Sequence, residues 1–166
     1  MSEQDTTEGY VNGADTAPVA GVISQYVKDL SFENPNAPAV YQSQTAPAID
    51  VQFNIAASPI ADGVHEVELK IEVKAVADDE AVFVVDLTYA GLFGLRNVPD
   101  EHLQPFLLGE APRILFPFAR RIIADAVRDG GFPPLMLEPI DFQALFIQQA
   151  QAQQGVTGTI EGVGQA

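Results

Sequence analysis

The chain has no cysteine, which excludes disulfides and thiolate metal sites. Its 166 residues contain no run that approaches the ~20 apolar residues a membrane-spanning helix needs. Basic residues are scarce, because 8 Lys and Arg stand against 23 Asp and Glu, for a formal net charge of −15. Such a surface repels phosphate backbones and anionic lipids and attracts basic proteins, although the charge could also serve solvation alone. Nucleic-acid and membrane partners are therefore disfavoured.

The acidic, polar start at residues 1–8 is the reverse of a secretory signal, so we expect a soluble, cytoplasmic protein. Patterns that carry catalysis are also missing. Neither His65 nor His102 is accompanied by a metal-ligand set, and no nucleophile-elbow pattern occurs. Gly91 and Gly94 lack the following Lys-Ser/Thr of a phosphate loop. We expect no enzyme activity, no metal site and no cofactor.

Residues 65–76 carry the clearest structural pattern, in which apolar and charged side chains alternate. The apolar positions are Val67, Leu69, Ile71, Val73 and Ala75, and the charged positions are Glu66, Glu68, Lys70, Glu72 and Lys74. Successive side chains of a strand point to opposite faces. The segment is therefore predicted to be a half-buried β-strand with one dry face and one charged face.

Three more strands are predicted, at residues 23–32, 50–56 and 81–89. In the first, Tyr26, Lys28, Leu30 and Phe32 fall on one side, and Val27, Asp29, Ser31 and Glu33 fall on the other. Tight turns at Asp62-Gly63 and at residues 78–80 link the last three strands into antiparallel hairpins. The proline-containing connection at residues 33–47 is long enough for the first strand to cross over and pair out of sequence.

The second half of the chain has helical periodicity. One short helix is predicted from Pro99 to about Gly109, and a second from Pro112 to Arg128, with a bend at Pro117. A third helix, capped by Asp141, carries Phe142, Leu145, Phe146 and Gln149 on one face.

Apolar side chains of the second helix cover an arc of roughly 220°, about twice the ~100° of a surface helix. A single sheet cannot bury that much circumference. Either another part of the same fold or another copy of the chain must cover the remainder, and we favour another copy.

Four separated segments closely resemble the SecB family of bacterial export chaperones. They are KDLSFENPNAP at residues 28–38, YAGLF at 89–93, ILFPFAR at 114–120 and GFPPLMLEPIDF at 131–142. The resemblance spans about residues 22–150. It implies an α+β fold with a four-stranded antiparallel sheet, helices on one face, and a dimer of dimers.

The resemblance also implies a function and its residues. SecB chaperones hold preproteins unfolded and deliver them to the SecA motor, without catalysis or a cofactor. By motif, the SecA-binding positions are Asp29, Ser31, Glu33, Val84 and Asp86. The expected client-binding positions are Val40, Tyr41, Leu137, Phe142 and Phe146. The expected oligomer interface contains Ile114, Phe118 and Ile122.

Several alternatives remain open at this stage. Each acid of the SecA-binding set could belong to a solvated strand face, and Phe142 and Phe146 could be core residues. The chain could also be a SecB-like chaperone dedicated to a toxin–antitoxin pair, or an oligomeric scaffold without chaperone activity. The expected organisation is a disordered leader at residues 1–20, a chaperone domain at 21–151 and a disordered tail at 152–166.

Overall fold

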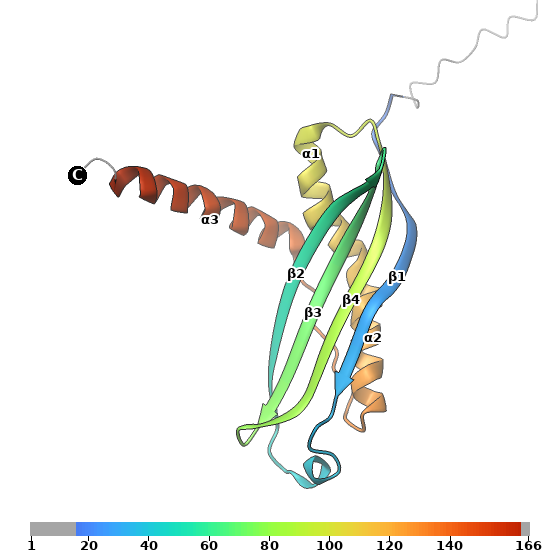
Figure 1. Cartoon of the computed structure of the whole chain (residues 1–166), viewed down its shortest axis with the longest axis vertical. Coiled ribbons are helices and arrows are strands. Elements are labelled where there is room, and N and C mark those ends of the chain that lie inside the picture. Colours follow the sequence, from blue (N-terminus) through green and yellow to red (C-terminus); the bar gives the residue numbers. More distant parts are fainter. Residues whose placement is uncertain (1–15, 164–166) are drawn as a thin grey trace, which may run out of the picture.

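The computed structural model describes residues 16–163 of the chain, with side-chain surroundings given through residue 152. Its centre is a four-stranded antiparallel sheet with the strand order β1-β4-β3-β2 (Figure 1). The strands are β1 (Val19–Glu33), β2 (Ala48–Ala61), β3 (Val64–Ala77) and β4 (Glu80–Arg96). The predicted four-stranded antiparallel sheet and the out-of-sequence pairing of the first strand are therefore confirmed.

Alternation in β3 separates the two faces of the sheet as the sequence predicted. The inward apolar side chains of this strand are at most 1% exposed, whereas Lys70 and Lys74 are exposed on the other face. The β3–β4 turn has positive φ angles at Asp78 (52°) and Asp79 (62°). Positive φ at two successive residues matches the twist of a tight hairpin, and aspartate tolerates it better than most residues. The predicted hairpins are thus present.

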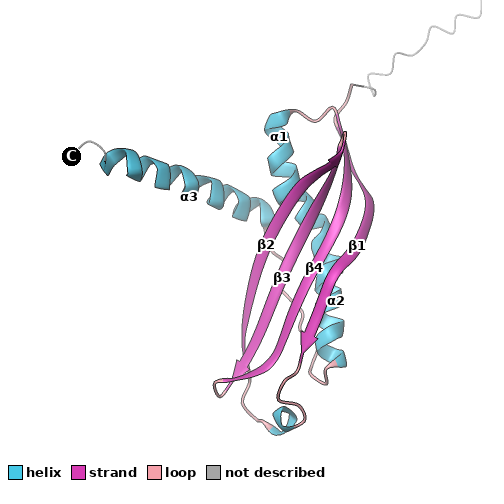
Figure 2. Ribbon diagram, in the orientation of Figure 1, coloured by secondary structure: helices cyan, strands magenta, loops and turns pink. Residues whose placement is uncertain are grey.

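The crossover connection at residues 34–47 leads from β1 at one edge of the sheet to β2 at the other edge (Figure 2). It contains a short 3-10 helix, η2 (Ala39–Gln42). Asn36 fastens it to the sheet, since its Nδ2 donates to the carbonyl of Ala81 at 2.7 Å. This bond holds the connection beside the β3–β4 turn.

Strand β1 differs from the prediction in its start and in its faces. It begins at Val19, within the segment predicted as a leader. Register shifts between Val22 and Ser24 and between Val27 and Asp29 interrupt the alternation. A β-bulge inserts one extra residue, so side chains on its two sides can share a face. Lys28 consequently reaches the charged face of the sheet together with Asp29, and the predicted separation of these residues is wrong.

Strand β4 continues to Arg96 rather than ending near Tyr89. It passes through Gly91, where an added Cβ would lie 2.9 Å from the Leu115 side chain. Glycine in this strand therefore permits the close approach of a helix, and it does not mark the end of the strand.

The helical half begins with α1 (Asp100–Pro105), η3 (Phe106–Glu110) and α2 (Ala111–Asp129). Backbone angles stay helical at Glu110 and Ala111, so the three segments form one continuous helical path. The prediction of two helices separated near Gly109 is wrong. Segment η3 is a π-helical turn, and its wider turn accommodates Pro112 without ending the helix.

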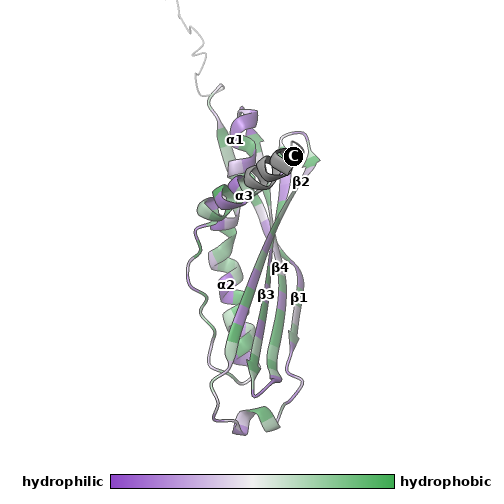
Figure 3. Ribbon diagram, turned by 90° about the vertical axis from the view of Figure 1, so that its left-hand side faces the viewer, coloured by the Kyte–Doolittle hydropathy of each residue, from purple (hydrophilic) through white to green (hydrophobic). Residues whose placement is uncertain are grey.

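Helix α2 packs along one face of the sheet, so the domain has two layers (Figure 3). The side chains that face the sheet are at most 1% exposed, namely Leu115, Ala119, Ile123 and Val127. Pro117 lies inside the helix as predicted. On the outer side, Phe118 is 44% exposed and stacks on Tyr89 with ring centroids 6.4 Å apart. The sheet therefore covers only part of the apolar arc.

Helix α3 (Phe142–Val163) is capped as predicted, because the backbone N–H of Ala144 donates to Asp141 Oδ1 at 3.0 Å. Its first turn packs on the domain, and the helix then points away from it (Figure 1). Its backbone continues to Val163. The predicted boundary between domain and tail at residue 152 stays a prediction. Residues 148–154, rich in Gln and Ala, have good helix propensity, whereas the Gly and Thr residues at 155–163 have little.

Residues 1–15 and 164–166 of the predicted leader and tail lie outside the described residues. Across residues 16–163, none of the helices has the length and apolar character needed to cross a bilayer.

Candidate functional site: an aromatic groove and an acidic sheet face

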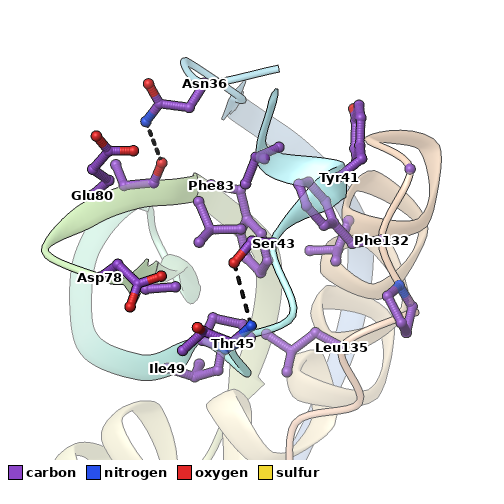
Figure 4. A pocket seen from close by; sticks show the side chains of 18 of the residues that line it. Asn36, Tyr41, Ser43, Thr45, Ile49, Asp78, Glu80, Phe83, Phe132 and Leu135 are labelled. Carbon is purple, nitrogen blue, oxygen red and sulfur yellow. Dashed lines mark hydrogen bonds between the residues drawn. The ribbon is translucent and has the colours of Figure 1, made fainter. Parts of the chain in front are cut away.

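A groove of about 780 Å³ opens between the crossover connection and the segment that follows α2 (Figure 4). Tyr41 and Val40 come from the connection, Phe132 and Leu135 from the segment, and Phe83 from β4. Most of the side chains in its wall are apolar. The backbone after Phe132 runs through two consecutive prolines, which cannot continue a helix and keep this wall extended.

Aromatic rings connect the walls of this groove. Tyr41 and Phe132 have ring centroids 5.5 Å apart, and Phe132 and Phe83 are 5.2 Å apart. Phe32 of β1 extends the series, with its ring 6.1 Å from that of Phe83. Aromatic pairs at these separations are mutually attractive. Three separate parts of the chain therefore line the groove with the rings of Tyr41, Phe83 and Phe132, and Phe32 packs behind Phe83; we call it the aromatic groove.

Polar groups at the groove come from its rim. The Tyr41 hydroxyl donates to the carbonyl of Gly130 at 2.7 Å and accepts from Asn34 Nδ2 at 2.7 Å. Among the lining residues the charged side chains are Asp78 and Glu80, both exposed. The site is thus an apolar groove with an acidic rim, a form that suits binding of apolar chain segments.

Of the predicted client-binding residues, the structure brings Val40 and Tyr41 together in the groove. Tyr41 is 49% exposed. Leu137 and Phe142 are 7% and 1% exposed, so both belong to the core and their prediction as surface contacts is wrong. Phe142 packs between Phe53 and Phe116, with centroids 6.2 and 5.7 Å away. Phe146 is half-buried on α3 and does not line the groove.

Sequence reasoning missed Phe132 and Leu135 as groove residues. The signal that could have found them is the proline pair between them, because apolar side chains on an extended segment cannot form the continuous buried stripe of a helix. Leu137 and Phe142 were misassigned because periodicity identifies an apolar side but not what packs against it.

The opposite face of the sheet brings the five predicted SecA-binding residues together. Ser31 pairs with Asp86, and Glu33 pairs with Val84, across the β1–β4 ladder. Asp29 lies beside Thr88 in the same ladder. Alternate positions of a strand share a face, so all five side chains lie on this one. We call the region defined by these residues the acidic face.

Some carboxylates on this side of the sheet form ion pairs and others do not. Glu72 has an ion pair with Lys74 at 3.1 Å. By contrast, Asp29, Glu33 and Asp86 are exposed, and within the described residues they form no ion pair. These three carboxylates remain available to a basic partner.

A polar cluster adjoins the acidic face. Lys28 Nζ lies 3.0 Å from a Glu66 carboxylate oxygen and 2.5 Å from one of Glu68. The Tyr26 hydroxyl also donates to Glu66. Burial, and then this hydrogen bond, raises the pKa of Tyr26 to about 12. The Tyr26 hydroxyl, followed by Lys28, lowers the pKa of Glu66. Here the acids are satisfied within the chain.

The predicted oligomer row lies on the outer side of α2. Ile114 and Ile122 are half-buried, and Phe118 between them is exposed. Their spacing of four residues places them along one flank of the helix, where Ile114 and Ile122 also pack against the core and Phe118 stacks on Tyr89. In residues 16–152, no three His, Asp or Glu side chains are grouped as metal ligands.

The lowered pKa of Glu66 predicts how the free energy of unfolding depends on pH. The ionised carboxylate stabilises the fold fully above its ordinary pKa of 4.5, and this contribution is lost as the pH falls through the lower folded pKa. Glu66→Gln should therefore reduce the free energy of unfolding at neutral pH. The difference from wild type should shrink below pH 4.5. Urea unfolding across this range measures it.

Glu33→Gln is the matched control, because it removes a carboxylate from the same sheet face that has no ion pair among the described residues. It should leave the free energy of unfolding nearly unchanged at neutral pH. A Glu66→Gln difference that stays constant from about pH 7 to about pH 3 would contradict the role of the ionised carboxylate.

Comparisons with known proteins agree with this architecture. The family model described as preprotein translocase subunit SecB matches residues 13–153. The protein-export protein SecB of Sphingopyxis alaskensis is 67% identical over 93% of this chain and 91% of its own length. That of Rhizorhabdus wittichii is 60% identical over 92% of this chain and 93% of its own.

Among solved structures, the SecB-like chaperone of Mycobacterium tuberculosis in complex with an antitoxin peptide matches with a TM-score of 0.62. It is 18% identical, and the match covers 73% of this chain and 90% of that one, so it bears on the fold alone. The family model and the SecB relatives, with most of the chain aligned, show that this chain belongs to the SecB family.

Proposed function

We propose that this protein is an export chaperone, which binds unfolded preproteins, keeps them competent for translocation and delivers them to SecA. The proposal places it in the cytoplasm and gives it no catalytic role or cofactor. The observation that carries it is an open aromatic groove of about 780 Å³ in a chain of the SecB family. Relatives at 60% identity or more are named protein-export proteins.

Client capture follows from the chemistry of the groove. Unfolded chains expose apolar side chains that folded proteins bury, and apolar burial is not directional. A groove of this kind can therefore accept many sequences. Burying one large apolar side chain contributes about 1.5–3 kcal/mol, so a single groove binds weakly. Several grooves on one assembly would hold a long client much more firmly.

We propose Val40 and Tyr41 as client contacts, with Phe132 and Leu135 added from the opposite wall. Phe146 is proposed as a further contact on α3. Leu137 and Phe142 are not included, because their side chains are buried.

Replacing Tyr41 with Ser should weaken capture of unfolded clients by about tenfold, the factor that corresponds to the loss of roughly 1.4 kcal/mol of apolar contact. Tyr41 is half-exposed, so the free energy of unfolding should change little. Equilibrium binding to a reduced, unfolded polypeptide measures the effect. Phe142→Ser is the control, since loss of this core ring should lower stability first. If Tyr41→Ser unfolds the protein or leaves capture unchanged, Tyr41 is not a client contact.

Assembly into a dimer of dimers is proposed from the apolar surface of the single chain. The outer row of α2 contains Phe118, at 44% exposure, between Ile114 and Ile122. Edge strand β1 exposes Ile23 at 59% and Leu30 at 46%. Exposed apolar patches and open strand edges favour association. Pairing of two sheets through their β1 edges would cover the exposed side chains of β1. Packing of two such dimers through α2 would cover Phe118.

Sedimentation equilibrium should give a mass of about four chains at micromolar concentration. Phe118→Glu should lower this mass, because it places a charge within the proposed apolar interface. Met136→Glu is the matched control, as Met136 is 58% exposed but lies outside the row. A wild-type protein that stays monomeric, or equal dissociation by both variants, would contradict the proposed interface.

The acidic face is the proposed docking surface for SecA. A basic segment of the partner would meet the carboxylates of Asp29, Glu33 and Asp86, with Val84 offering a small apolar contact. Exposed ion pairs contribute only about 0–1 kcal/mol each, so no single charge should dominate. The attraction is screened beyond ~8 Å at physiological ionic strength, so affinity should fall as salt rises.

Reversing Asp29 and Asp86 together to Lys should abolish SecA docking, because repulsion replaces attraction at two points of the face. Neither side chain faces the core, so stability and client capture should persist. Titration against SecA at low and moderate salt, beside a client-binding control, measures this. Unchanged SecA affinity would place the docking surface elsewhere.

A further inference from the structure

We propose that Asn34 is a positioning residue of the aromatic groove, where its side-chain amide fixes the Tyr41 ring before a client arrives. The inference rests on the proposed function, because it assigns Asn34 a part in client capture. Asn34 follows the last residue of β1 and does not itself line the groove. Its effect would pass through Tyr41.

Three polar groups form a closed triangle at this point. Asn34 Nδ2 donates to the Tyr41 hydroxyl at 2.7 Å and to the Gly130 carbonyl at 3.2 Å. The Tyr41 hydroxyl donates its own hydrogen to the same carbonyl at 2.7 Å. An asparagine amide has two N–H groups, so both donations are available at once. The triangle ties the end of β1, the crossover connection and the end of α2 together.

Only one orientation of the Asn34 side-chain amide suits these partners, the one that points its N–H groups toward Tyr41 and Gly130. Asn34 Oδ1 is buried and has no hydrogen-bond partner among the described residues, which is unfavourable for a carbonyl oxygen. Turning the amide over would bring this oxygen against the Gly130 carbonyl, and two acceptors repel each other. The side chain therefore keeps its N–H groups on Tyr41 and Gly130 although its oxygen stays unpaired.

Packing alone restrains the Tyr41 ring weakly. The side chain is 49% exposed, and its ring neighbour is Phe132 at 5.5 Å. Gly131 lies beneath it with a φ of 89°, and a Cβ added there would come within 3.0 Å of the ring. The hydrogen bonds of the hydroxyl group hold the far end of the ring in place. Without them the Tyr41 side chain would rotate freely, and it would lose that freedom when a client binds. Ordering a side chain before binding removes that entropic cost.

Fluorine NMR of the full chain labelled with 3-fluorotyrosine tests the inference, because the sequence has few tyrosines and Tyr41 can be assigned by Tyr41→Phe. In Asn34→Ala the Tyr41 signal should report a mobile ring, and the dissociation constant for a reduced, unfolded polypeptide should rise about threefold to tenfold. Tyr41→Phe should weaken capture similarly. The double variant should be no weaker than Tyr41→Phe alone, since Tyr41→Phe already removes the bond from Asn34 together with the bond to Gly130.

Asn36→Ala is the matched control, because it removes the other anchor of the crossover connection and does not touch the triangle. It should leave the Tyr41 signal ordered. Should Asn34→Ala fail to fold, Tyr41→Phe carries the affinity test by itself, and unweakened capture there would overturn the inference.

Besides unweakened capture by Tyr41→Phe, three results would overturn the proposal for Asn34 alone while wild-type capture remains normal. They are an ordered Tyr41 ring in Asn34→Ala, an unchanged dissociation constant in a folded Asn34→Ala, and equal loss of ring order in Asn36→Ala. A wild-type protein that captures no unfolded chain would instead overturn the proposed function, and with it any role of Asn34 in capture.

Discussion

The packing of α2 on the sheet is the constraint on which the rest of the structure depends. Leu115 and Ile123 are fully buried against the strands, and Gly91 allows the helix to approach. The helix ends at Gly130, where a Cβ would lie 2.3 Å from the Phe32 ring. Because the helix stops there, the following chain must leave as the extended segment that forms one wall of the aromatic groove. The same packing leaves Phe118 exposed and Ile114 and Ile122 half-buried.

The two faces of the sheet separate two kinds of chemistry. Its inner face supplies Phe83 to the groove, while its outer face carries Asp86, three residues further along β4. Alternation along one strand therefore serves apolar capture and charged docking without either disturbing the other. Lys28 pairs with both Glu66 and Glu68 beside the acidic face, whereas Asp29, Glu33 and Asp86 have no ion pair in the part of the chain that the structure describes. In the proposed function these faces hold the client and the motor.

Periodicity predicted the sheet, its crossover and the charged face, because alternation in β3 and the turns at Gly63 and Asp78 are local signals. It failed where distant parts of the chain decide the outcome. The bulge at Lys28 depends on pairing with β4, and the burial of Phe142 depends on Phe53 and Phe116. The likeness to an antitoxin-bound SecB-like chaperone bears on the fold alone, whereas relatives at 60% identity or more are named export proteins.

The central claim, that the aromatic groove captures unfolded chains without regard to sequence, is tested most directly by an aggregation assay. Several unrelated polypeptides are diluted from denaturant with and without the purified protein, and light scattering follows their aggregation. The account predicts slower aggregation of each polypeptide, no binding to the same polypeptides once folded, and release when SecA is added. Suppression of one polypeptide alone, or of none, would contradict it and would favour a dedicated chaperone or a scaffold of the same fold.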